Sequence, residues 1–295
     1  MGWQILHISQ PAQLTLEHKQ CSLFLVEKHE KVILPFDNLS AVIIESHAVT
    51  ITSALLQAFS ANQIAVFVCN ETHLPNGILL PFMPYFAYSK VAHLQAAWTE
   101  PFKKQIWKRI VQAKIANQAY VLKRQFRNKE AKKMTSMAAY VQTGDIGNLE
   151  GQAAAFYWRT LFGNSFSREQ KIFANAALNY GYAILRGMVA RCLTGTGFVP
   201  CFGVHHCNQL NAFNLADDLL EPFRPLVDLK VLNLNKPEND TLSPHDKASI
   251  LELLVKEYLF EQEQRSLLNI CEIVTSSLMQ ATEQKDYRKL KLFLL

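Results

Sequence analysis

Residues 4 to 83 alternate short apolar segments with polar or turn-forming residues. The apolar segments are rich in β-branched and aromatic side chains, and they read QILHIS, AQLTLEH, CSLFLVE, KVILPF, AVIIES, IAVFVCN and ILLPFM. Segments of this length, bounded by turn residues such as those at 75–77, are typical of β-strands. Residues 52 to 62 differ, because their apolar residues recur every three or four positions, as in a helix. We therefore predict a meander or small sandwich with one helix.

After Pro84 the hydrophobic pattern changes to the helical period. From about Thr99 onward, stretches such as FKKQIWKRIVQAKIANQAYVLKRQF keep this period, and glycine and proline are sparse. We place the junction near 84–98. The fold class predicted is α+β, with a β-rich dimerisation domain at 1–90 and a larger all-helical domain at 91–295. Two domains also suit the length of 295 residues.

Composition places the chain among globular proteins, since 49% of its residues are hydrophobic and 19% are charged. Its 6 cysteines show no CxxC spacing, which favours free thiols in a reducing cytoplasm. The N-terminus lacks the features of a signal peptide, and no apolar run is long enough to cross a bilayer. We expect a cytoplasmic protein with no membrane partner.

The net charge of +5 is unevenly distributed along the chain. Residues 1–95 carry 4 basic and 6 acidic side chains, which leaves 26 basic and 19 acidic side chains for the rest. Residues 103–133 alone hold 11 lysines and arginines and a single acid, Glu130. This run indicates a polyanion-binding surface on the second domain. The alternative is a solvated basic helix face.

The segment HHCNQLNAFNLADDLLEPFRP, residues 205–225, contains an unusual set of polar side chains. If the segment is one helix, a single polar stripe forms along it, made of Asn208, Asn211, Asn214, Asp218 and Glu221. A solvated face usually includes lysine and arginine, whereas this stripe offers only amides and carboxylates before Arg224. A zinc site built from the cysteines and histidines at 201–207 is a poorer match, because the spacing lacks a second ligand pair.

Glu150, within GNLEGQAAAFYWRTLF, is a further candidate. It is placed near the first turn of a helix, where an acid can simply stabilise the helix dipole. Taken together with a histidine and the pair Asp218 and Glu221, it suggests a hard-cation site, since carboxylates brought together repel unless a cation lies between them. An imidazole among the ligands shifts the preference from Mg²⁺ toward Mn²⁺.

The motifs NLEGQAAAFYW and FGVHHCNQLNAFNLADDLLEPFRPLVD resemble the CRISPR-associated integrase of the spacer-acquisition machinery. The EPFRP segment is similar to the form that accompanies RNA-guided single-protein (type II) effectors. The resemblance implies that Glu150, His206 and Glu221 are the catalytic metal ligands. It implies auxiliary roles for Asp218 and for Arg224, which would face DNA phosphate, and it leaves the role of His205 open.

The resemblance also implies a reaction, in which the 3′-hydroxyl of a short DNA fragment attacks the phosphodiester at a CRISPR repeat border, with Mg²⁺ or Mn²⁺ as cofactor. Water in place of the hydroxyl gives endonuclease activity. The double-stranded DNA, prespacer and CRISPR repeat, would lie on the basic helices, with contacts from Lys103, Lys104, Lys108, Arg109, Lys123, Arg124 and Arg127.

Implied partners are a second copy of the chain and a small ferredoxin-like CRISPR protein that bridges two homodimers in a heterohexamer. The RNA-guided effector nuclease is a further candidate partner. Two alternatives stay open: a helical DNA-binding scaffold without catalytic metal, and an unrelated metal-dependent hydrolase of small phosphate esters. The scaffold predicts no dependence on divalent metal, and the hydrolase would not need the basic helices.

Overall fold

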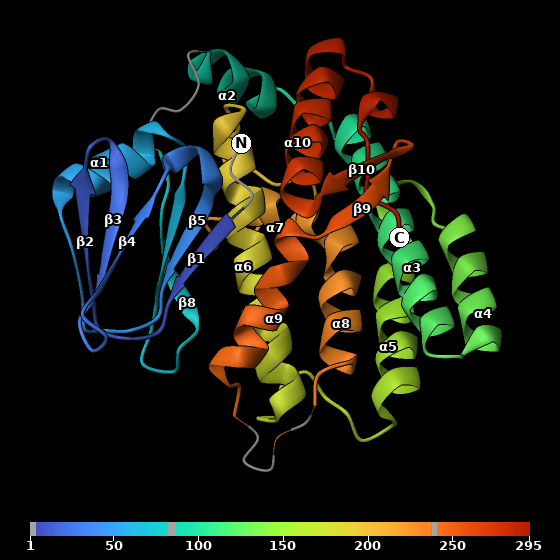
Figure 1. Ribbon diagram of the computed structural model, residues 1–295. Helices are drawn as coiled ribbons and strands as arrows, with labels where there is room; N and C mark the ends of the chain where they lie inside the picture. The colour runs from blue at the N-terminus through green and yellow to red at the C-terminus, as the bar shows by residue number, and fades with distance from the viewer. Residues whose placement is uncertain (1–3, 82–86, 236, 238–240) are drawn as a thin grey trace.

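The computed structural model describes residues 4–81, 87–235, 237 and 241–295. Strands dominate the first part of the chain and helices the second, which confirms the predicted α+β class (Figure 1). Phe82 and Met83 of the last predicted strand segment, and residues 84–86 of the predicted junction, lie outside the described residues. Position 90 falls within the first helix after the strands, and the division at 90/91 stays a prediction.

Two four-stranded sheets make up the β-rich region. Their strand orders are β1-β5-β7-β8 and β4-β3-β2-β6. The bounds are β1 Gln4–Ile8, β2 Ala12–Glu17, β3 Gln20–Leu25, β4 Glu30–Leu34, β5 Leu39–Ile44, β6 Val49–Ile51, β7 Ala65–Cys69 and β8 Pro75–Leu79, with helix α1 Ser53–Ala61 between β6 and β7. All seven predicted segments contribute strands, and the predicted helix is confirmed. The short strand β6 was not predicted.

Parallel pairing of β1 with β5 and of β5 with β7 makes this region a sandwich rather than a meander. Strand β5 is buried along its whole length. Because successive side chains of a strand point to opposite faces, Val42 and Ile44 enter the core between the two sheets, whereas Ala41 and Ile43 enter the core of the helical region. The strand therefore forms the wall shared by two hydrophobic cores.

Two further contacts join the β-rich and helical regions. The ring of Phe67 on β7 lies against Gly187, where an added Cβ would come within 2.1 Å of Phe67 Cε1. Lys247 Nζ donates to Glu45 Oε1 at 2.6 Å, and both side chains are buried. Close backbone packing and a buried ion pair hold the sheet firmly against the helices.

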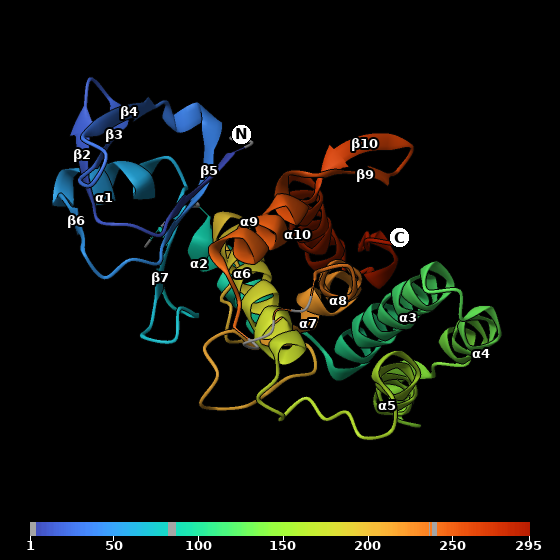
Figure 2. The ribbon, with the colours of Figure 1, turned by 60° about the horizontal axis from the view of Figure 1, so that its bottom comes forward.

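Nine helices lie within the second region, among the residues described. They are α2 Tyr88–Ala96, α3 Glu100–Arg124, α4 Asn128–Ala139, α5 Leu149–Phe162, α6 Phe173–Gly195, α7 Asn214–Leu220, α8 Arg224–Leu232, α9 Pro244–Val255 and α10 Leu267–Gln284. Helices α3, α4 and α5 form a group on the side away from the sandwich, and α6 lies between this group and the sandwich (Figures 1 and 2). In the described part of the chain, none of the helices combines the length and the apolar character that crossing a membrane requires.

One antiparallel hairpin interrupts the helical region, so the prediction of an all-helical domain is wrong in this detail. Its strands are β9 Glu257–Phe260 and β10 Glu263–Ser266. Glu261 and Gln262 take positive φ angles of 49° and 70°, which is the backbone of a two-residue hairpin turn. Neither is the glycine or asparagine that usually marks such a turn, so the turn is hard to recognise from its residues.

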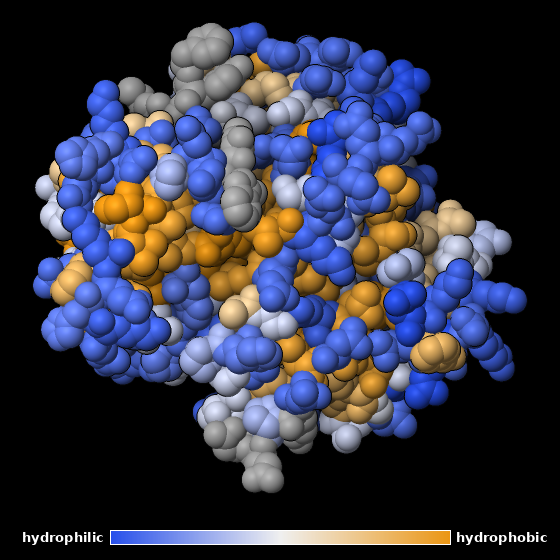
Figure 3. All heavy atoms as spheres, viewed as in Figure 1, coloured by the Kyte–Doolittle hydropathy of each residue, from blue (hydrophilic) through white to orange (hydrophobic). Residues whose placement is uncertain are grey.

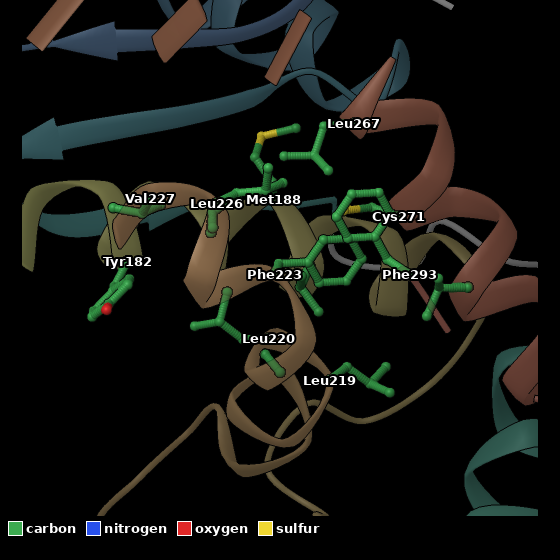
Figure 4. Close-up of a cluster of buried hydrophobic side chains, with 14 of the residues drawn as sticks. Tyr182, Met188, Leu219, Leu220, Phe223, Leu226, Val227, Leu267, Cys271 and Phe293 are labelled. Carbon is green, nitrogen blue, oxygen red and sulfur yellow. The ribbon is translucent and has the colours of Figure 1, made fainter. Parts of the chain in front are cut away.

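Helices α7 and α8 are joined by a 3₁₀ turn, Glu221–Phe223, and are fixed by their apolar face. Leu219, Leu220 and Phe223 enter the core, where Phe223 stacks on Phe293 with ring centroids 5.4 Å apart (Figure 4). Burial of this face anchors the segment that carries Asp218 and Glu221, and it fixes the direction in which their carboxylates point.

Candidate metal and nucleic-acid site

The acidic segment is helical only from Asn214 onward, so Asn208 and Asn211 do not belong to one helical stripe with Asp218 and Glu221. The carboxamide oxygens of Asn208 and Asn211 accept the backbone N–H groups of Leu210 and Phe213, each two residues further on. Local turns of this kind compete with helix formation. The Asn214 amide donates to the carbonyls of Cys201 and Asn208, which fixes the start of α7.

Asp218 organises the loop before α7. Its carboxylate is completely buried and accepts four hydrogen bonds. The backbone N–H groups of Val204, His205 and His206 donate to it at 2.6, 3.1 and 3.1 Å, and His206 Nδ1 lies 2.7 Å from Oδ1. Asp218 therefore fixes the conformation of residues 204–206, the histidine loop, and its carboxylate is not free for other contacts.

The two histidines have different environments. Because Asp218 binds His206 Nδ1, Nε2 is the ring nitrogen left for a ligand, an arrangement common behind metal-binding histidines. The same hydrogen bond raises the pKa of His206. The ring of His205 lies flat on Trp107, with centroids 4.1 Å apart and planes within 2°, and burial lowers its pKa.

Replacement of Gly203 by alanine tests the loop. A Cβ there would lie 2.3 Å from the His206 carbonyl oxygen and 2.8 Å from Asp218 Oδ2. We expect the free energy of unfolding to fall by about 2 kcal/mol, because the backbone must shift away from the Asp218 carboxylate and the His206 carbonyl. Denaturant unfolding measures it. Gly147→Ala is the matched control, since no atom of the described residues lies within 4 Å of its added Cβ; an equal loss in both variants would contradict the close packing of this loop.

Glu150 occupies the first turn of α5, as predicted from the sequence. The Asn148 side chain accepts the N–H of Gly151 at 3.2 Å, and the Asp145 carboxylate accepts the N–H groups of Leu149 and Glu150, each at 2.9 Å. Side-chain acceptors satisfy the free N–H groups of a helix start. The side chain of Glu150 therefore does not cap its own helix, and it is available for other contacts.

Lys114 lies between the two carboxylates predicted as metal ligands. This residue of α3 is buried, and its ammonium contacts Glu150 Oε1 and also Glu221 Oε2, the latter at 2.5 Å. On its other side, Glu221 Oε1 lies 2.9 Å from Arg224 Nε. Burial alone would raise the pKa of Glu221, but Arg224 and Lys114 lower it to about 2, so this carboxylate is charged at neutral pH.

Arg224 contacts this cluster and is half-buried. Its guanidinium lies over the ring of Tyr182, 4.7 Å from the centroid, as well as against Glu221. Tyr182 and Tyr157 in turn donate to the buried carboxylate of Asp228. Burial raises the pKa of Asp228 to about 6. A network of polar groups therefore continues from the candidate site into the protein.

The candidate ligands fit a divalent cation in part. No three His, Cys, Asp or Glu side chains converge on a metal position within the described residues. Glu150 and Glu221 nevertheless share one positive charge at Lys114, and two carboxylates that meet at a cation suit a hard divalent ion. His206 offers Nε2 from the neighbouring loop. The side chain of Glu150 is 28% exposed against 7% for Glu221, so solvent reaches the pair of carboxylates from the side of Glu150.

The predicted DNA-contacting residues divide into two groups. Lys104, Lys123, Arg124 and Arg127 are exposed, the last three at the turn between α3 and α4. The other three are half-buried: Lys103 pairs with Glu100, Lys108 lies on the same helix, and Arg109 donates to the Tyr287 carbonyl at 2.6 Å.

A groove of about 560 Å³ runs beside His206. Its lining includes Trp98, Lys103, Asn208 and Asn211. A basic side chain and several amides therefore border the open side of the histidine loop. Such groups suit contacts with a nucleic-acid backbone.

The sequence matches the family model for CRISPR associated protein Cas1 over residues 6–252. It is 38% identical over 294 residues to the CRISPR-associated endonuclease Cas1 of Neisseria meningitidis serogroup C (strain 8013), and the match covers 99% of this chain and 96% of that relative. The chain therefore belongs to the Cas1 family, as its motifs predict.

Solved structures share the fold. A casposase bound to its integration product has a TM-score of 0.75 at 18% identity, over 99% of this chain and 92% of that chain. A chain of a Cas6-RT-Cas1–Cas2 complex also has a TM-score of 0.75, at 19% identity, over 98% of this chain and 36% of that longer chain. These likenesses show the common architecture.

Three residues of the site were not singled out from the sequence. Asp145 and Asn148 hold the start of α5, and a cap signal ahead of the helix is their only trace in the sequence. Lys114 was counted with the basic run, yet it points inward. Its neighbours on α3 offer a signal, because Asn117 and Gln118 are polar residues on a helix face that is otherwise apolar.

Proposed function

We propose that this protein is a divalent-metal-dependent DNA endonuclease and integrase, which inserts short foreign DNA fragments into a CRISPR array. The observation that carries the proposal is that Glu150 and Glu221 both contact the buried ammonium of Lys114. They lie beside the loop of His205 and His206, which Asp218 holds in place. Membership of the Cas1 family, and a relative described as an endonuclease, support a nuclease role. The fold shared with a casposase bound to its integration product supports strand transfer.

The reaction requires little chemistry from protein nucleophiles, because the attacking 3′-hydroxyl belongs to the DNA fragment. A Mg²⁺ or Mn²⁺ ion would polarise the scissile phosphate at the repeat border. Glu150, Glu221 and His206 Nε2 are the groups that would hold it. Asp218 fixes the orientation of His206, and Lys103, in the neighbouring groove, would position the DNA backbone.

A single incubation tests the proposal. A plasmid with a CRISPR repeat and labelled short duplexes are combined with the protein, Mn²⁺ or Mg²⁺, and the small CRISPR partner protein. Labelled DNA joined at the repeat border is the expected result, and chelation of the metal should abolish it. Tight DNA binding without metal-dependent joining would instead favour the helical scaffold. Cleavage of small phosphate esters without binding to long DNA would favour the unrelated hydrolase.

We also propose that the chain is a homodimer formed through its β-rich region. Strand β4 is a sheet edge, and it exposes Val32 and Ile33. Apolar surface continues from the β-rich region toward α9 (Figure 3), over a groove whose lining includes Leu34 and Leu251. Sheet edges and apolar patches of this kind are usually covered by a partner.

Replacement of Ile33 by glutamate should shift the protein from dimer to monomer. A charge at the centre of an apolar contact loses its hydration without gaining a partner. Light scattering coupled to size exclusion reports the mass. Leu259→Glu, on the exposed strand β9, is the matched control and should stay dimeric. A dimeric Ile33→Glu protein would move the interface elsewhere.

The remaining proposed partners follow from family membership. Double-stranded DNA would contact the exposed basic residues at the turn between α3 and α4. The similar chain in a Cas6-RT-Cas1–Cas2 complex supports assembly with a small CRISPR partner protein, which would bridge two homodimers in a heterohexamer. Association with an RNA-guided type II effector nuclease rests on the EPFRP segment alone.

A further inference from the structure

We propose that the Lys114 side chain takes two alternative positions, depending on whether a divalent cation is bound. In the metal-free protein its ammonium neutralises Glu150 and Glu221, and when a divalent cation binds these carboxylates the ammonium withdraws toward Gln118. The inference rests on the proposed function, because it concerns the same pair of carboxylates. It assigns to Lys114 the control of cation entry, which is distinct from a DNA contact.

The first position follows from the ion pairs. Lys114 is 7% exposed, and it reaches one oxygen of Glu150 on α5 and one oxygen of Glu221 at the end of α7. The other oxygen of Glu221 is held by Arg224. A divalent ion shared by the two glutamates needs an oxygen of Glu221, and the one that Arg224 does not hold is the one that Lys114 contacts. Lysine and metal therefore compete for one position.

The second position follows from an unsatisfied acceptor one turn along α3. Gln118 is 2% exposed, and among the described residues its Oε1 has no hydrogen-bond partner. Residues four apart share a helix face, and both Lys114 and Gln118 line the same hollow of about 230 Å³. A buried acceptor without a donor is costly. An ammonium moved along this face would satisfy it.

The hollow can accept the charge. The carboxylate of Asp228 is part of its lining, and it would act as a counter-ion. Two guanidinium groups also border the space: Arg168 donates to Asn175 and Asn179, Arg224 pairs with Glu221, and the charges of both act on Asp228 as well. The withdrawn ammonium would thus face the Gln118 amide oxygen and one carboxylate.

The exchange changes the charge of the site. With Lys114 in place, two carboxylates face two cations, Lys114 and Arg224, and the cluster is neutral. A divalent ion then adds two positive charges to the site, because the ammonium moves within the hollow and does not leave it, and this added charge suits a phosphodiester. The cluster would therefore attract DNA phosphate only after it has bound metal.

The test is Mn²⁺ binding to the full-length protein, measured by calorimetry without DNA. Lys114→Met should tighten binding by about tenfold or more, because the competing ammonium is gone. Gln118→Leu should weaken it by about tenfold, because the withdrawn ammonium then lacks its acceptor. The double variant should bind like Lys114→Met. Lys171→Met, at an exposed lysine outside the site and outside the basic run 103–133, is the matched control for loss of one charge.

Thermal unfolding provides a second readout. Without metal, Lys114→Met should unfold about 5 °C or more below wild type, since two carboxylates are left without their shared cation. Saturating Mn²⁺ should restore most of the difference. In Gln118→Leu the lysine keeps both ion pairs, so this variant tests the second position even if Lys114→Met does not fold without metal.

The outcomes are distinguishable. Equal Mn²⁺ affinity in wild type and Lys114→Met, or a Gln118→Leu effect that persists in the double variant, overturns the inference and leaves the proposed function intact. If wild type and Lys114→Met both fail to bind Mn²⁺, the proposed function and the inference fail together.

Discussion

Replacement of Glu221 by glutamine is expected to reduce strand transfer by at least about a hundredfold, with duplex binding close to that of wild type. Glutamine keeps the size of the side chain and removes the charge that meets the shared cation. Glu221 is buried and its pKa is lowered to about 2, so the wild-type group is charged throughout the working pH range. The measurement is joining of labelled duplex to a repeat plasmid, alongside a gel-shift titration.

Glu150→Gln and His206→Ala should have the same effect, because each removes a further candidate ligand. His205→Ala is the internal control. Its ring stacks on Trp107, and it is the backbone N–H of His205 that donates to Asp218, so strand transfer should fall much less. Near-normal strand transfer in any of the three ligand variants, with metal bound and the fold intact, would remove that residue from the set.

Charge reversal of Lys123, Arg124 and Arg127 together should weaken binding to all duplex sequences alike. These exposed side chains cluster at the turn between α3 and α4, and hydrogen bonds to phosphate carry no sequence information. The slope of log affinity against log salt should flatten by about 0.9 for each phosphate that the variant no longer neutralises. A salt titration of wild type and variant on one labelled duplex measures both effects.

A variant with the same change in net charge separates direct phosphate binding from bulk charge. Lys19, Lys28 and Lys285 are exposed elsewhere on the molecule, and their joint reversal should leave the salt slope unchanged. Parallel lines for wild type and the Lys123, Arg124, Arg127 variant would place the DNA path on another part of the helical region.

The sequence was informative where a pattern depends on neighbours along the chain. Alternation and β-branched residues located the strands, and the position of Glu150 at the start of α5 followed from the polar residues before a small, apolar run. The start of α7 was misplaced, because the three-residue spacing of Asn208, Asn211 and Asn214 is also compatible with successive turns. Side-chain acceptors close to their own backbone decided between the two.

Other features depend on groups far apart in sequence, and so they could not be predicted. Charge alone grouped Lys114 with the surface lysines of 103–133, whereas its direction is set by Glu150 and Glu221 on other elements. The resemblance implied that Arg224 faces DNA phosphate, which stays a prediction, and its ion pair with Glu221 could not be predicted from the sequence. Burial of a charged side chain requires a partner, and a partner is visible only in three dimensions.

The seat of Phe67 on Gly187 has a mechanical consequence. Because the Phe67 ring is in direct contact with the backbone of α6, the sheet cannot slide over this helix without a steric clash. The sandwich and the helices should therefore move as one rigid unit, which carries the β4 edge on the sandwich and the carboxylates of Glu150 and Glu221 on the helical region. In a dimer formed at that edge, a small tilt between the two copies would be magnified into a large change in the separation of the two reaction centres.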